Sequence, residues 1–159
     1  NDIDLLSDLA NDGEKMHVRV TSDQAWRTAA VATERWVLGL SPDVPIDLRV
    51  DTGIGNADLD LSELALQELS IDSGIGNLQV SLPMNGDYTA DISTGIGKVN
   101  LYTPRDTAVR VRVDQGITSV KIDERFERSG DYYLAGEASA ATGVIEVSID
   151  AGIGQVTVH

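Results

Sequence analysis

The tripeptide Gly-Ile-Gly recurs along this chain at a fixed interval, and this repeat constrains the fold more than any other feature. Copies begin at residues 53, 74 and 95, and a degenerate copy with threonine in third place begins at residue 116, one further period along the chain. The last copy begins at residue 152, one period plus 15 residues later. A fixed period of this length is typical of repeat architectures. The residues of the five copies are Gly53, Ile54, Gly55, Gly74, Ile75, Gly76, Gly95, Ile96, Gly97, Gly116, Ile117, Gly152, Ile153 and Gly154.

Aligning the copies places apolar residues in columns on both sides of the tripeptide. One column holds Val50, Ile71, Ile92, Val113 and Ile149. Within each copy apolar and polar residues alternate, which predicts two short strands joined through Gly-x-Gly. Because glycine tolerates the backbone of a sharp bend, we expect the isoleucine to point inward and fill the corner. The predicted fold is all-β: a parallel β-solenoid, a short β-helix-like stack with rungs of 21 residues about 4.8 Å apart.

The chain is expected to form a single domain over residues 1–159. Residues 1–13 are predicted to be a short helix or a linker, and residues 16–159 the stacked rungs. Residues 123–142 form an insertion that holds Phe126, Tyr132 and Tyr133. We expect this insertion loop to fold over a flank or end of the stack, with a recognition loop as the alternative.

Charge and composition narrow the classes of partner. The formal net charge is −14, spread along the chain, which disfavours nucleic acid and anionic membrane faces because both need a basic patch. No apolar run is long enough to span a membrane, so we expect no direct membrane insertion. The chain begins at Asn1, so we expect a processed piece whose signal or anchor segment lies outside it.

No pattern of residues indicates catalysis, and we expect neither an enzyme nor a cofactor. A dinucleotide fingerprint needs a third glycine and a following helix, whereas each Gly-Ile-Gly continues into a strand. Cysteine is absent, and the two histidines, His17 and His159, lie at opposite ends of the chain, where we expect both to be exposed. A polysaccharide-active β-helix enzyme remains a further alternative, which would need clustered carboxylates in a groove.

Four carboxylates share one column and are the candidates for a calcium site, although the sequence favours no metal. They are Asp51, Asp72, Asp114 and Asp150, and Ser93 interrupts the column. Stacked carboxylates repel one another, and a calcium ion bound by their oxygens would remove this repulsion. The other explanation is a solvated outer face on which Asp, Ser and Thr hydrogen-bond near the corner.

Residues 40–61 resemble bacterial toast-rack domains. Leu40-Ser41-Pro42-Asp43-Val44-Pro45-Ile46-Asp47-Leu48 matches their pattern Leu-x-Pro-x-x-Pro-hydrophobic-x-Leu, and Gly-x-Gly rungs follow it. The segment from Gly152 to Val158 is similar to their closing Gly-x-Gly-x-Val-x-Val. The chain from Trp36 to His159 also resembles the C-terminal domain of LiaF-type cell-wall-active antibiotic response proteins. This resemblance implies a stacked β-solenoid outside, or attached to, a bacterial membrane, with a link to envelope stress in some relatives.

We therefore expect a non-catalytic, extracytoplasmic binding or regulatory module of a bacterial cell-envelope protein. A protein or another envelope component is its expected partner. The alternative is a structural or adhesive surface protein that forms homo-oligomers by stacking of the solenoid ends. This alternative rests on the last inward residue, Val158, after which the terminal rung would be bare. An unprotected sheet edge of this kind pairs readily with another chain.

Overall fold

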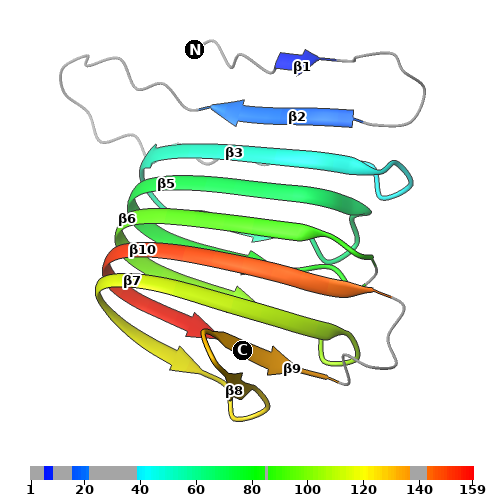
Figure 1. Ribbon diagram of the computed structural model, residues 1–159. Helices are drawn as coiled ribbons and strands as arrows, with labels where there is room; N and C mark the ends of the chain where they lie inside the picture. The colour runs from blue at the N-terminus through cyan, green and yellow to red at the C-terminus, as the bar shows by residue number, and fades with distance from the viewer. Residues whose placement is uncertain (1–5, 9–15, 22–38, 85, 137–142) are drawn as a thin grey trace, which may run out of the picture.

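The computed structural model describes residues 6–8, 16–21, 39–84, 86–136 and 143–159. Within these ranges the chain is all-β, with ten strands in one mixed sheet and no helix, hence no helix that could cross a membrane (Figure 1). The strands are β1 (Leu6–Asp8), β2 (Met16–Thr21), β3 (Ile46–Ile54), β4 (Ala57–Asp60), β5 (Leu66–Ser81), β6 (Thr89–Tyr102), β7 (Ala108–Ile122), β8 (Glu127–Ser129), β9 (Tyr132–Ala135) and β10 (Val144–Val158).

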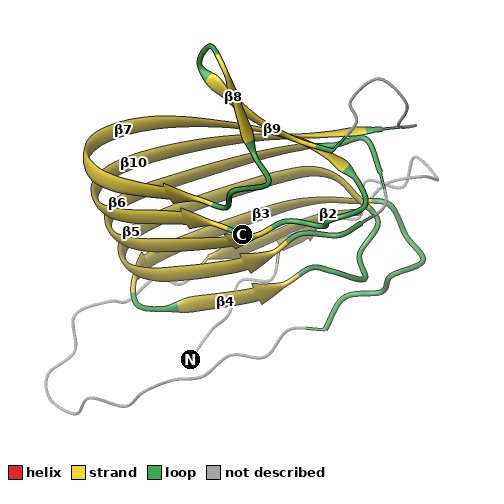
Figure 2. Ribbon diagram, turned by 90° about the horizontal axis from the view of Figure 1, so that it is seen from below, coloured by secondary structure: helices red, strands yellow, loops and turns green. Residues whose placement is uncertain are grey.

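The long strands bend at their Gly-Ile-Gly, so that the sheet folds over on itself (Figure 2). We call the part before the bend the first leaf and the part after it the second leaf. Both leaves alternate buried and exposed residues, as a strand with one face on a core requires. Ile71 and Ile92 of the first leaf are buried in one cluster with Leu78 and Val80 of the second leaf. The core therefore lies between the two leaves.

Strand pairing confirms the columns read from the sequence. β5 and β6 pair in parallel at an offset of one repeat period, with Ile71 opposite Ile92 and Val80 opposite Leu101. β10 continues the same columns, because Ile149 lies opposite both Ile92 and Val113. Each column is thus a ladder of aliphatic side chains, one from each strand.

The order of the strands differs from the order of the sequence. β10, the last strand, lies between β6 and β7, giving the order β3-β5-β6-β10-β7 (Figure 1). The expectation of a bare final rung ending at Val158 is therefore wrong, since β10 is paired on both sides. The strand at this end of the stack is β7.

Thr118 gives a physical reason for the position of β7. In the other bends the third residue is a glycine with φ between 148° and 156°, and Gly76, Gly97 and Gly154 each lie close against the neighbouring strand. Thr118 replaces it in β7, and its hydroxyl donates to the carbonyl oxygens of Ala151 and Gly152, at 3.1 Å each. A bend altered in this way is tolerated where no further strand stacks on it, and terminal repeats are commonly atypical.

The N-terminal segment differs from expectation, whereas the insertion lies at the end of the stack, which is one of the expected positions, and forms strands there. Leu6–Asp8, within the predicted helix, forms β1 and pairs antiparallel with β2, while residues 1–5 and 9–13 lie outside the described residues. Pairing with the edge of β2 outweighs a weak helical spacing. Residues 127–135 of the insertion form a hairpin, β8–β9, whose second strand pairs antiparallel with β7. Residues 137–142 of the insertion are not described.

Candidate functional site

The Gly-Ile-Gly bends depend on glycine because neighbouring strands approach one another closely there. Gly97 has a φ of 155°, in the region that favours glycine, and a Cβ on it would overlap the carbonyl oxygen of Gly76. A Cβ on Gly76 would likewise overlap the carbonyl oxygen of Gly55. The tripeptide therefore sets both the turn of the chain and the close stacking of the bends.

The isoleucines of the bends point outward, which corrects the sequence-based prediction that they fill the corner. The exposed fractions, taken along the stack, are 79% for Ile54, 47% for Ile75, 46% for Ile96, 50% for Ile153 and 79% for Ile117. The three inner side chains are less exposed than the two at the ends, because each packs against isoleucines on both sides. The five form one continuous apolar row on the outside of the molecule, which we call the isoleucine ridge.

The alternation of inward and outward side chains shifts by one position at each bend. This shift explains why the bend isoleucines were predicted to point inward. In β5 the inward residues are Ile71, with an odd number, and Leu78, with an even number, so the alternation shifts by one position at the bend. Ile75 has the same parity as Ile71, and simple alternation therefore assigns it inward. The chain turns around the core at this point, and the side chain at the turn points away from both leaves.

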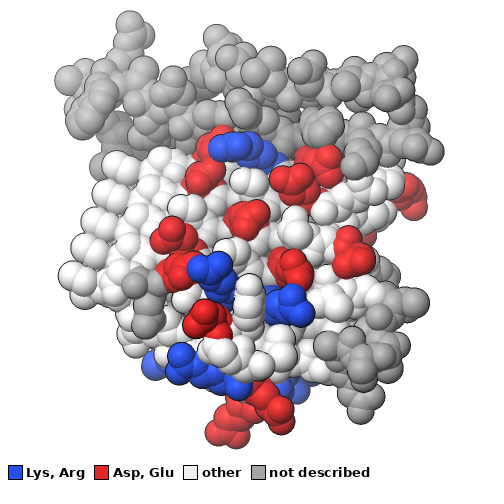
Figure 3. All heavy atoms as spheres, viewed as in Figure 1, with Lys and Arg blue, Asp and Glu red and all other residues white. Residues whose placement is uncertain are grey.

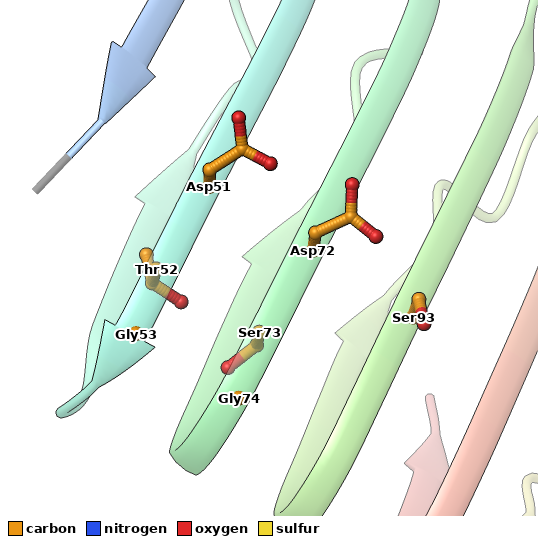
Figure 4. Close-up of a pocket in the computed structure, with 7 residues that line it drawn as sticks. All are labelled: Asp51, Thr52, Gly53, Asp72, Ser73, Gly74 and Ser93. Atoms are coloured by element: carbon orange, nitrogen blue, oxygen red, sulfur yellow. The ribbon is translucent and has the colours of Figure 1, made fainter.

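The four calcium candidates lie in one row on the outer face of the first leaf. Along the stack the row reads Asp51, Asp72, Ser93, Asp150 and Asp114. Asp51 and Asp72 point the same way from β3 and β5 beside a shallow cleft of about 370 Å³ (Figure 4). The cleft is lined by Asp51, Thr52, Gly53, Asp72, Ser73, Gly74 and Ser93.

Arginines, rather than a third carboxylate, lie next to these candidates. Arg49 contacts Asp72 at 3.1 Å and Asp51 at 3.6 Å, and so offsets the repulsion between the two carboxylates. Asp114, at the far end of the row, is paired with Arg112 at 3.1 Å. In the part of the chain that the structure describes, no three His, Cys, Asp or Glu side chains are grouped to hold a metal ion. Arginine ion pairs thus lie at both ends of the row.

Charged side chains gather on this outer face, whereas Lys98 is the single charged residue next to the bends. Figure 3 shows acidic and basic groups across the first leaf, while the side of the molecule at the left, where the strands bend in Figure 1, carries neither. On the second leaf, amides form part of the outer surface, with Asn77 donating to the Oδ1 of Asn56 at 3.0 Å.

His159, exposed as expected, stacks on Tyr102 with ring centroids 4.6 Å apart, whereas the side chain of His17 lies outside the described part of the structure.

The β7 end of the stack holds a second cavity that sequence reasoning missed. It has a volume of about 320 Å³ and lies between β7 and the β8–β9 hairpin. Arg112, Val113, Asp114, Val120, Arg128, Asp131 and Tyr133 line it. The degenerate copy at residues 116–118 is the feature of the sequence that could have indicated this end of the stack, because terminal repeats are commonly atypical.

Arg125 fastens the connection from β7 to the hairpin. Its guanidinium donates to the carbonyl oxygens of Thr103, Pro104 and His159 at 2.9–3.0 Å, and also to the Thr103 hydroxyl. The ring of Phe126, which is buried, lies 4.7 Å from this guanidinium. Burial lowers the pKa of Arg125 from its usual value, and Asp123 partly opposes that shift. The hairpin is thus tied to the ends of the second leaf.

Comparison with known proteins gives a family and a fold. The family described as the N-terminal domain of toast_rack, DUF2154, matches residues 4–102, so the match includes an N-terminal region that the sequence resemblance left out. Among curated proteins, none matches the chain. A crystal structure of a proposed cell adhesion protein from Clostridium sporogenes ATCC 15579 is similar, with a TM-score of 0.73 and 22% identity. The similarity covers 90% of this chain and 69% of that one.

Proposed function

Because the chain belongs to the family of toast_rack N-terminal domains, we propose that it is a non-catalytic binding module of a bacterial cell-envelope protein, outside the cytoplasm. We infer that its long strands form a short parallel β-solenoid in which each rung is one repeat period long, on the basis of the β5–β6 pairing. The observation that carries the proposal is the uncovered edge of β7. Its partner would be an extended segment of another protein.

The edge of β7 is covered over only part of its length. One side of the strand pairs with β10 from Ala108 to Ile122. On the other side β9 pairs with Val109–Arg112, and in the described part of the chain no strand pairs with residues 113–122. A free edge presents backbone donors and acceptors that another extended chain can satisfy.

The core is also incompletely closed at this end. Val113, Val120 and Ile122 point toward the core but are only partly buried. The matching residues of β10, which are Ile149, Val156 and Val158, are fully buried. A strand added to β7 would cover the three partly exposed side chains, so we expect its inward positions to be apolar. This apolar burial would add to the backbone hydrogen bonds.

The similar Clostridium protein supports a role in contacts at the cell surface, because its description names cell adhesion. The same β7 edge also favours a second candidate, end-to-end assembly of copies into a structural or adhesive polymer. A polysaccharide-cleaving function has less support, since the two carboxylates beside the cleft on the first leaf are both paired with Arg49.

A library of random peptides, selected for binding to the purified chain, tests the proposal. We expect selected peptides to alternate apolar and polar residues and to protect the amides of residues 113–122 from hydrogen exchange. Val120→Lys should abolish this binding, because an inward-pointing charge blocks strand addition to an edge. Ser119→Lys adds the same charge on the exposed neighbour and should retain binding.

The outcomes separate the candidates. Peptides that bind both variants equally, or that protect a different segment, would contradict the β7 edge as the binding site. If Val120→Lys fails to fold, the hydrogen exchange of the unmodified chain still decides the location. Protection of residues 113–122 that rises with protein concentration in the absence of peptide would support end-to-end assembly instead.

A further inference from the structure

The isoleucine ridge is an exposed apolar surface that shares only Ile117 with the proposed binding edge. Its five side chains together expose apolar surface on the order of 500 Å², the size of the largest apolar patch on a typical monomeric protein, which is often functional. Single exposed aliphatic residues need no explanation, but five in one row do. The ridge runs the length of the stack, from the bend of β3 to the bend of β7.

The ridge lies in a strip almost without charge. The strip comprises residues 52–57, 73–78, 94–99, 115–120 and 151–156, and Lys98 is its single charged residue. The molecule as a whole has a net charge of −14, so most faces of two copies repel each other. At the bends two copies can approach with little electrostatic cost.

The shape of the strip also suits a second copy. A row of glycines borders the ridge on one side, and the row on its other side is glycine except for Thr118, so few side chains hold a partner away. The isoleucines repeat at the spacing of the strands, about 4.8 Å. A second copy has the same spacing, so its ridge can pack in register against this one, as side chains do between paired sheets.

We propose that this chain forms a homodimer through its isoleucine ridge, with the two stacks antiparallel. A two-fold axis through the central Ile96 places Ile75 of one copy opposite Ile153 of the other, and Ile54 opposite Ile117. The buried area is at the low end for specific interfaces, so the dimer is weak and reversible. This contact shares Ile117 with the β7 edge and leaves the other residues of that edge free.

Sedimentation velocity over a concentration series measures this association. The unmodified chain should pass from monomer to dimer as its concentration rises. Ile96→Lys should remain a monomer, because it places two cations together on the two-fold axis. Met84→Lys is the matched control, since Met84 is exposed to a similar extent but lies off the ridge, and it should dimerise normally.

Cysteine substitutions locate the axis, because the chain has no cysteine of its own. With a short bis-maleimide crosslinker, Ile96→Cys should give a covalent dimer. Ile54→Cys should react only when mixed with Ile117→Cys. A chain that stays monomeric at every concentration overturns the proposal. A dimer that survives Ile96→Lys also overturns it and places the contact elsewhere, with the β7 edge as the next candidate.

Discussion

At the scale of single residues, Ile71 and Ile75 show how position decides the role of a side chain. Both are isoleucines of β5, four residues apart, and each shares a column with isoleucines of other strands. Ile71 is fully buried between the leaves, whereas Ile75 is about half exposed at the bend. The same residue type therefore supplies core packing at one position and surface at the other.

We expect Ile71→Asp to destabilise the fold by more than about 3 kcal/mol, because it buries an unpaired charge. Ile75→Asp should change the free energy of unfolding by less than about 1 kcal/mol, as surface substitutions do. Urea denaturation of the two variants measures the difference. Equal losses of stability would show that the bend isoleucines belong to the core after all.

At the scale of elements, the bends are held together by contacts between backbones. Gly97 and Gly76 stack so closely that the missing Cβ is a requirement of the packing. Gly53 differs, because it lies in the bend of β3 and a Cβ there would meet no atom within 4 Å. The glycines of the repeat therefore look equivalent in sequence and are unequal in the structure.

Replacement by alanine separates the two kinds of glycine. Gly97→Ala should cost about 1–3 kcal/mol for its backbone conformation alone, and the overlap with Gly76 adds to this. Gly53→Ala should be neutral to within about 0.5 kcal/mol. Thermal unfolding of both variants tests this difference between the two glycines. A large loss of stability from Gly53→Ala would contradict the open space next to Gly53 in the bend of β3.

At the scale of the whole molecule, the position of β10 makes the stack depend on the last segment of the chain. β10 separates β6 from β7 and pairs with both along its length. Arg110 of β7 also reaches Glu146 of β10, with 2.9 Å between the charged groups. Without β10, the buried residues Ile92, Val99 and Leu101 of β6 lose their neighbours on one side.

Ending the chain after Gly136 should therefore abolish cooperative thermal unfolding, followed by circular dichroism. A stack in sequence order would instead lose only its final rung and keep a cooperative transition. Removal of residues 1–15 is the control. Among the described strands this deletion removes β1 alone, which pairs with the edge of β2 over three residues. A truncated chain with a native-like melting curve would contradict the dependence on β10.

The repeat period, the columns and the glycine bends follow from the sequence alone, because stacking in register requires the same residue type at each level. Leu78 and Val80 could be placed in the core on this basis. Thr118 also indicates that β7 lies at an end of the stack, because terminal repeats are commonly atypical. These features depend on local chemistry repeated along the chain.

Tertiary structure alone decided three further features. The alternation switches phase at each bend, so the direction of Ile75 depends on how the leaves close around the core. The columns fit β10 on either side of β7, so the strand order depends on the hairpin that occupies part of the β7 edge and on the altered bend at Thr118. Arg49 can pair with Asp72 because parallel stacking brings residues 23 positions apart into contact. Each of these features depends on which segments become neighbours, and a repeat with identical columns leaves that choice open.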